Sequence, residues 1–215
     1  MNGFGELTLA FGVFLLSHSI PPLAPVRGRL IARLGRRGYL AAYSVVSTAV
    51  LVWLISAALR APYVALWGRP DWSPWVPLLV MPIAFILLVG GIITPNPLSV
   101  SFRAGMPRHP GVLRLTRHPV LWAGALWAGA HLVANGDVAA VMMFGLFAAL
   151  ALAGMPLMDA RSRKALGEAE WRRLVAGLKS QRGDGLMRSI VLGLAAYGGF
   201  LALHPWLIGV SPLPH

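Results

Sequence analysis

The sequence contains no cysteine in its 215 residues. Disulfides, iron–sulfur clusters, thiolate-ligated haem and a cysteine nucleophile are therefore excluded. Charged residues are scarce as well, at 12% of the chain, whereas soluble domains carry roughly 25%. Only 7 residues are acidic, and none stands at HExxH-like spacing from a histidine, which argues against a catalytic zinc site.

Apolar residues dominate instead. They make up 57% of the chain, and the mean hydropathy is +0.67, which predicts a membrane protein. The formal net charge of +12 would suit a nucleic-acid partner. However, the arginines lie in short segments between apolar runs, where they are typical of membrane topology. We therefore expect the lipid bilayer as a partner and no nucleic acid.

Six apolar runs have the length, about 20 residues, that crosses a bilayer as a helix. The runs are 3–20, 39–61, 73–94, 119–136, 137–158 and 187–209. The first lacks a basic leader and a small-residue cleavage site, so we expect it to be retained. A tight turn at 135–137 separates the fourth run from the fifth. The predicted fold is all-α: a polytopic integral membrane bundle of six transmembrane helices in one domain, residues 1–215.

The basic residues support this count. Three segments that we expect to be loops between the spans, 21–38, 95–118 and 159–188, hold 17 of the 19 basic residues, and the alternate segments hold only Arg60 and Arg69. Because basic segments stay in the cytoplasm, both termini are expected outside. Within the third segment, residues 161–179 place Trp171 and Leu178 on a broad apolar stripe opposite charged residues. This pattern predicts one amphipathic helix on the cytoplasmic surface.

Four of the six histidines lie in or at the edge of a predicted span: His18, His118, His131 and His204. His109 lies in a loop and His215 at the end of the chain. An ionisable residue inside a span is costly and indicates a functional site. The alternative is a neutral imidazole that forms a hydrogen bond between helices. Because four histidines occur in or near the spans of so apolar a chain, we favour the interpretation that some of them are metal ligands.

His131 has the most informative neighbours. Gly124 and Ala128 share its helix face, and Trp127 precedes it by one turn. Two small residues beside a histidine leave a slot for a flat macrocycle, or they allow close contact with another helix. Two histidines without a carboxylate suit haem iron. The cytoplasmic arginines are candidate partners for the haem propionates.

Several stretches resemble the NnrU family of membrane proteins, over nearly the whole chain. They are SHS at 17–19, RGRLIARLGRRGY at 27–39, RHP at 117–119, LWAGAHLVANGD at 126–137, FG at 144–145 and HPWLIGVSP at 204–212. The resemblance implies a multi-pass protein of the bacterial inner membrane, linked to nitrite and nitric oxide reduction in denitrifying bacteria.

The same domain is similar to the plant 15-cis-zeta-carotene isomerase, which binds haem b through histidines and isomerises a carotenoid double bond. This similarity implies a haem b cofactor with His131 and His18 as the iron ligands, near Gly124 and Trp127. It also implies a carotenoid-like apolar molecule as a partner, whereas the link to denitrification implies nitric oxide. The catalytic residues, the substrate and the oligomeric state stay open.

The predicted depth of each histidine in the membrane favours other pairs of iron ligands than His131 with His18. His18 lies near the cytoplasmic end of the first span, whereas His131 lies about 18 Å deeper into the fourth, at about 1.5 Å per residue. Iron ligands on two membrane helices are expected at similar depth. Depth therefore pairs His18 with His118 and His131 with His204, so His118 and His204 are also candidate cofactor-binding residues.

A second resemblance favours a different class of protein. RHPVLWAG at 117–124, followed by RKALGEAEWRRLV at 163–175, is similar to the isoprenylcysteine carboxyl methyltransferases, which bind S-adenosylmethionine. The residues that it implies around this cofactor are Arg117, His118, Glu168, Glu170 and Trp171. The pattern departs from that group at Leu121 and at 136–137, and it gives His131 and His204 no role. A third alternative is a non-catalytic membrane accessory protein or sensor.

Overall fold

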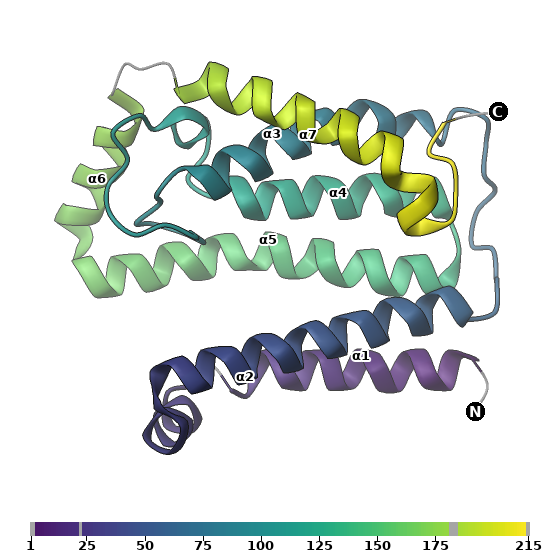
Figure 1. Cartoon of the computed structure of the whole chain (residues 1–215), viewed down its shortest axis with the longest axis horizontal. Helices are drawn as coiled ribbons and strands as arrows, with labels where there is room; N and C mark the ends of the chain where they lie inside the picture. Colours follow the sequence, from purple (N-terminus) through teal and green to yellow (C-terminus); the bar gives the residue numbers. More distant parts are fainter. Residues whose placement is uncertain (1–2, 22, 181–184, 214–215) are drawn as a thin grey trace. The chain divides into compact units, whose positions relative to one another are not determined.

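A computed structural model describes residues 3–21, 23–180 and 185–213; Arg182 and His215 lie outside the described residues. The described residues form helices and loops without a β-strand (Figure 1), which confirms the all-α prediction. The elements are α1 (Gly3–Ser19), α2 (Ala24–Arg60), α3 (Trp75–Ile93), the 3₁₀ helix η1 (Gly111–Arg114), α4 (Pro119–Asn135), α5 (Val138–Leu166), α6 (Glu168–Ser180) and α7 (Gly185–Ile208).

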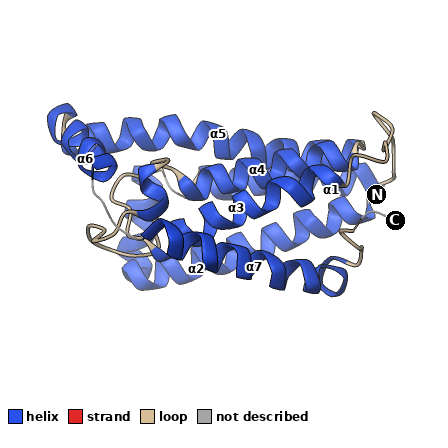
Figure 2. Cartoon of the chain, turned by 90° about the horizontal axis from the view of Figure 1, so that it is seen from above, coloured by secondary structure: helices blue, strands red, loops and turns tan. Residues whose placement is uncertain are grey.

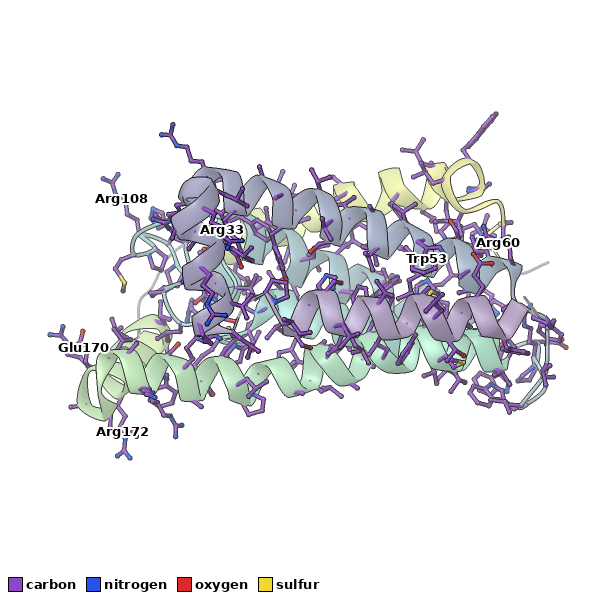
Figure 3. The ribbon with its side chains drawn as sticks, turned by 90° about the horizontal axis from the view of Figure 1, so that it is seen from below. Arg33, Trp53, Arg60, Arg108, Glu170 and Arg172 are labelled. Carbon is purple, nitrogen blue, oxygen red and sulfur yellow. The ribbon has the colours of Figure 1, made fainter. Side chains whose placement is uncertain are left out.

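The chain forms two compact units. Unit 1 comprises Met1–Trp67 and Asp137–Met143, and unit 2 comprises Gly68–Gly136 and Phe144–His215. In unit 1, α1 packs along α2. Near one end of this pair the Glu6 carboxylate accepts hydrogen bonds from the Trp53 indole at 3.1 Å and the Arg60 guanidinium at 2.6 Å. Figure 3 shows Trp53 and Arg60 on the same stretch of α2.

The basic segment 21–38, which we expected to be a loop, is mostly helical. Helix α2 begins at Ala24 and is interrupted only by a kink at Gly35, whose φ of 69° and ψ of 164° are not helical. Arginine, leucine and alanine are strong helix formers, and glycine tolerates the positive φ of the kink. Figure 3 shows Arg33 on the short helical part that precedes the kink.

In unit 2, α3 packs against both α4 and α7. Figure 2 shows α3 and α7 side by side. Their close approach depends on glycine, because a Cβ added to Gly193 would lie 2.5 Å from the Cα of Ile86. Helix α4 ends at Asn135 and is capped by Gly136, whose φ of 66° gives the left-handed conformation that terminates many helices. The turn that we predicted between the fourth and fifth runs is therefore confirmed.

Among the described residues, four helices are long and apolar enough to cross a membrane: Pro25–Arg60, Trp75–Ile93, Val138–Leu166 and Gly185–Ile208. Helices α1 and α4 have 17 residues each, about 26 Å at about 1.5 Å per residue, against a hydrocarbon core of about 30 Å. The count of six spans therefore stays a prediction for these two helices.

The helix that we predicted over residues 161–179 differs from our expectation in its boundaries. Helix α5 continues through residues 161–166, and a separate helix, α6, begins after Gly167, which has a φ of 80°. Trp171 and Leu178 of α6 are buried. Figure 3 shows Glu170 and Arg172 projecting outward from it. A positive φ favours glycine, so Gly167 divides the predicted single helix.

Candidate functional site

Two of the predicted site histidines, His131 and His204, line one cavity of unit 2. The cavity has a volume of about 440 Å³. Residues of α3, α4 and α7 and of the segments before α3 and after α7 form its walls. Aromatic side chains contribute much of the lining: Phe85, Trp127, Tyr197 and Phe200. A largely apolar cavity of this volume with a few convergent polar groups is typical of a ligand site.

The His131 imidazole is held in a defined orientation. Its Nδ1–H donates a hydrogen bond to the carbonyl oxygen of Trp127 at 2.8 Å. Its ring lies 5.8 Å from the ring of Trp127 and 5.3 Å from that of Phe144. Because a carbonyl only accepts, the proton of the neutral ring is on Nδ1, and Nε2 carries the lone pair.

His204 has the same tautomer for a similar reason. Its Nδ1–H donates to the carbonyl oxygen of Val210 at 2.8 Å. The positive φ of Gly209, 85°, turns the chain after α7 and brings this carbonyl to the imidazole. A histidine that ligates a metal through Nε2 usually donates Nδ1–H to a carbonyl or carboxylate in this way. Both cavity histidines therefore present the nitrogen that a metal requires.

His18 belongs to unit 1. Its Nδ1 donates to the carbonyl oxygen of Phe14 at 2.8 Å and lies 3.1 Å from the Ser17 hydroxyl. Its ring stacks on Phe14 with centroids 4.1 Å apart and lies 6.2 Å from the ring of Tyr43. His18 thus also keeps Nε2 for a ligand. The pairing of His18 with His131 stays a prediction.

Gly124 and Ala128 do not line the cavity that contains His131. A Cβ at Gly124 would be in ordinary contact, 3.7 Å, with the Cβ of Ala151 on α5, and Ala128 is fully buried. Of the two alternatives for this small face, the structure therefore supports close helix packing. Trp127, in contrast, does line the cavity.

His118 lies in a different environment, just before α4. The Ser99 hydroxyl lies 2.7 Å from Nδ1, and Nε2 lies 3.1 Å from Oδ1 of Asp159. Arg117 donates two hydrogen bonds to the same carboxylate, at 3.3 Å and 2.7 Å. Both ring nitrogens of His118 are engaged in this polar network. Cofactor binding by His118 stays a prediction, and it would require one of these contacts to break.

This network has the residue types of a hydrolase triad, Ser99, His118 and Asp159. In such a triad the carboxylate stabilises the imidazolium that forms during catalysis. Here Arg117 already neutralises Asp159, which weakens that effect. We missed Ser99 and Asp159 in the sequence because they lie 19 and 41 residues from His118, and only the packing of the loop after α3 against α5 brings them together.

The family of the chain follows from a comparison with family models. The model described as NnrU protein matches residues 6–212. The chain belongs to the NnrU family. Searches of curated proteins and of solved structures gave no match. The matched range includes all four candidate histidines, and it extends over both compact units of this NnrU-family chain.

The residues that resemble a methyltransferase site come together only in part in the NnrU-family structure: Arg117 lies near both His118 and Trp171, whereas Glu168 and Glu170 lie apart from them. Arg117 and His118 line a second cavity, but Glu168, Glu170 and Trp171 do not. Glu168 and Glu170 pair with Arg172 and Arg173 on the surface of α6. The Trp171 ring is instead covered by cations, since the guanidinium carbons of Arg163 and Arg117 lie 4.1 Å and 5.3 Å from its centroid.

Protonation of His118 is expected to destabilise this NnrU-family protein. Burial lowers the pKa of the His118 imidazole below its ordinary value of 6.5, and the Asp159 charge offsets only part of this effect. The stability contributed by the neutral ring is therefore complete above about pH 6.5 and is lost as the pH falls through the lower pKa of the folded state. We expect thermal unfolding in detergent to shift to lower temperature below pH 6.5, and to shift less in His118→Gln. If the unfolding temperature of His118→Gln fell as much below pH 6.5 as that of the unchanged protein, His118 would not be the group whose protonation destabilises the fold.

Proposed function

We propose that this NnrU-family protein is a membrane haem protein that binds haem b in the cavity of His131 and His204. One observation carries the proposal: both imidazoles line the same cavity, and each has its Nδ1–H bonded to a backbone carbonyl. In the described residues no group of three or more His, Asp or Glu side chains could hold a metal ion. Two histidines without a carboxylate suit haem iron, so His131 and His204 would fit this cofactor.

The chain's own residues have distinct roles in this proposal. His131 and His204 would hold the iron through Nε2, and the bonds from Nδ1–H to the two backbone carbonyls orient their rings. Trp127, Phe85 and Phe200 supply apolar surface that excludes water. Arg69, which also lines the cavity, is the cation that we assign to the haem carboxylates. When bound, haem supplies an iron centre whose oxidation state changes, with a potential set by these ligands and by burial.

The location that we propose is the inner membrane of a bacterium, with six spans and both termini outside the cytoplasm. The distribution of basic residues supports this orientation. In this arrangement α1 and α4 also span the bilayer, and α6 lies on its cytoplasmic surface with Arg172 and Arg173 toward water. The cavity of His131 and His204 then opens near the outer end of the bundle.

An apolar substrate fits this proposal better than a polar one. The aromatic lining of the cavity supports a carotenoid-like molecule, and the similarity to the carotenoid isomerase suggests isomerisation of a double bond. The alternative partner, nitric oxide, would have to displace His131 or His204 if both imidazoles held the iron. A sensor or accessory protein without turnover would use the same two ligands.

Titration of the haem-free protein with haemin tests the proposal. We expect a Soret band that grows linearly and saturates at equimolar haemin, because the cavity offers one pair of ligands. Addition of S-adenosylmethionine should leave the thermal stability unchanged. Haemin binding without saturation, together with stabilisation by S-adenosylmethionine, would support the methyltransferase alternative instead.

A further inference from the structure

A second cavity of unit 2 lies among η1, the loop that follows it, and helices α4, α5 and α6. Its volume is about 420 Å³. Leu113 and Leu178, both buried, form part of its wall. This second cavity shares no lining residue with the cavity of His131 and His204, so it is separate from the proposed haem site.

Positive charge is in excess in this cavity. Three cations line it: Arg114, Arg117 and Lys179. The carboxylate in its lining, Asp159, is already bonded to Arg117 and His118. In the part of the chain that the structure describes, no ion pair includes Arg114 or Lys179. The uncompensated charge favours an anionic ligand.

The same cavity also has an apolar edge. Trp122 and Leu115 line it with side chains that are 40% and 65% exposed, and Met155 lies beside them. Tryptophan is enriched where a membrane meets water, and Trp122 stands in the first turn of α4. A ligand that fills this cavity would contact both the cations and the exposed apolar surface. An anionic amphiphile has the charge and the apolar part that match these two contacts.

We infer that this cavity binds the phosphate-bearing headgroup of an anionic membrane phospholipid. Arg114 and Lys179 contact the phosphate, while Trp122 and Leu115 contact the adjoining part of the acyl chains. Basic cavities at the cytoplasmic ends of membrane helices bind such headgroups. Free phosphate shares the charge of the headgroup but makes no use of the apolar edge, so the two sources of phosphate are distinguishable.

The test uses the full-length protein in neutral detergent. Phosphatidylglycerol, phosphatidylcholine, inorganic phosphate and S-adenosylmethionine are added separately, and thermal stability and retained lipid in native mass spectra are measured. The double variant Arg114→Gln/Lys179→Gln is compared with Arg27→Gln/Arg29→Gln, which removes the same charge from unit 1. All four side chains are exposed or outside the core, so both variants are expected to fold.

We expect phosphatidylglycerol alone to stabilise the protein and to be retained. Its affinity should fall about 30-fold in the double variant, since each cation near a membrane surface contributes about fivefold, and by much less in the control. An equal loss in the control would overturn the inference, because general surface charge would then suffice. Stabilisation by inorganic phosphate without preference for the lipid would overturn the lipid assignment, as would stabilisation by S-adenosylmethionine that the double variant removes.

Discussion

The variant His131→Ala is expected to lose nearly all of its haem. His131 is the cavity histidine whose ring is fixed from both sides, by its bond to the Trp127 carbonyl and by the ring of Phe144. Alanine provides no ligand and leaves a gap of the size of an imidazole. The residual haem should show the broadened spectrum of a high-spin iron with a single axial ligand. Membrane insertion should be retained, because alanine is less costly than histidine in a span.

Two controls make the His131→Ala result specific. His109→Ala removes an exposed histidine from the loop before η1 and should leave the haem content unchanged. Free imidazole, added to His131→Ala together with haemin, should restore the low-spin spectrum because it fits the space left by the side chain. Full haem content in His131→Ala would show that His131 serves only as a hydrogen-bonding group between helices.

The second large effect distinguishes the two candidate pairs of ligands. We expect His204→Ala to lose as much haem as His131→Ala, because both residues line the same cavity. His18→Ala should keep its haem, since Phe14, Ser17 and Tyr43 account for the position of the His18 ring within unit 1. The measurement is the haem content of each purified variant, determined as pyridine haemochrome.

The opposite pattern would support the pair that the resemblance implies. If His18→Ala loses its haem and His204→Ala keeps it, then His131 and His18 are the iron ligands. The cavity would in that case hold an apolar partner and not the cofactor. His118→Ala is expected to retain haem under both pairings, because Ser99 and Asp159 engage both of its ring nitrogens.

Much of the helical architecture could be predicted from hydropathy and breaker residues. The predicted run 73–94 corresponds to α3 (Trp75–Ile93), and 187–209 corresponds to α7 (Gly185–Ile208). The prediction of a loop at 21–38 was wrong. We interpreted its arginines only as markers of membrane topology and neglected their high helix propensity. The break at Gly35 is a single backbone conformation that a hydropathy window does not detect.

The candidate site could be predicted only in part. Depth along the spans paired His131 with His204, and the structure places both in one cavity. The role of the small face of α4 could not be decided from residue spacing. The sequence does not show that α5 packs against this face, with Ala151 opposite Gly124. The partners of His118 were also beyond sequence reasoning, since Ser99 and Asp159 reach it from two other segments.

The absorption spectrum of the purified protein, recorded oxidised and then reduced with dithionite, tests the haem proposal most directly. With His131 and His204 on the iron, we expect a Soret band in the oxidised protein and sharp α and β bands of low-spin haem b after reduction. Addition of carbon monoxide should change the reduced spectrum slowly or not at all, because it would have to displace His131 or His204. A colourless protein from haem-replete cells, with no Soret band before or after added haemin, would contradict the proposal.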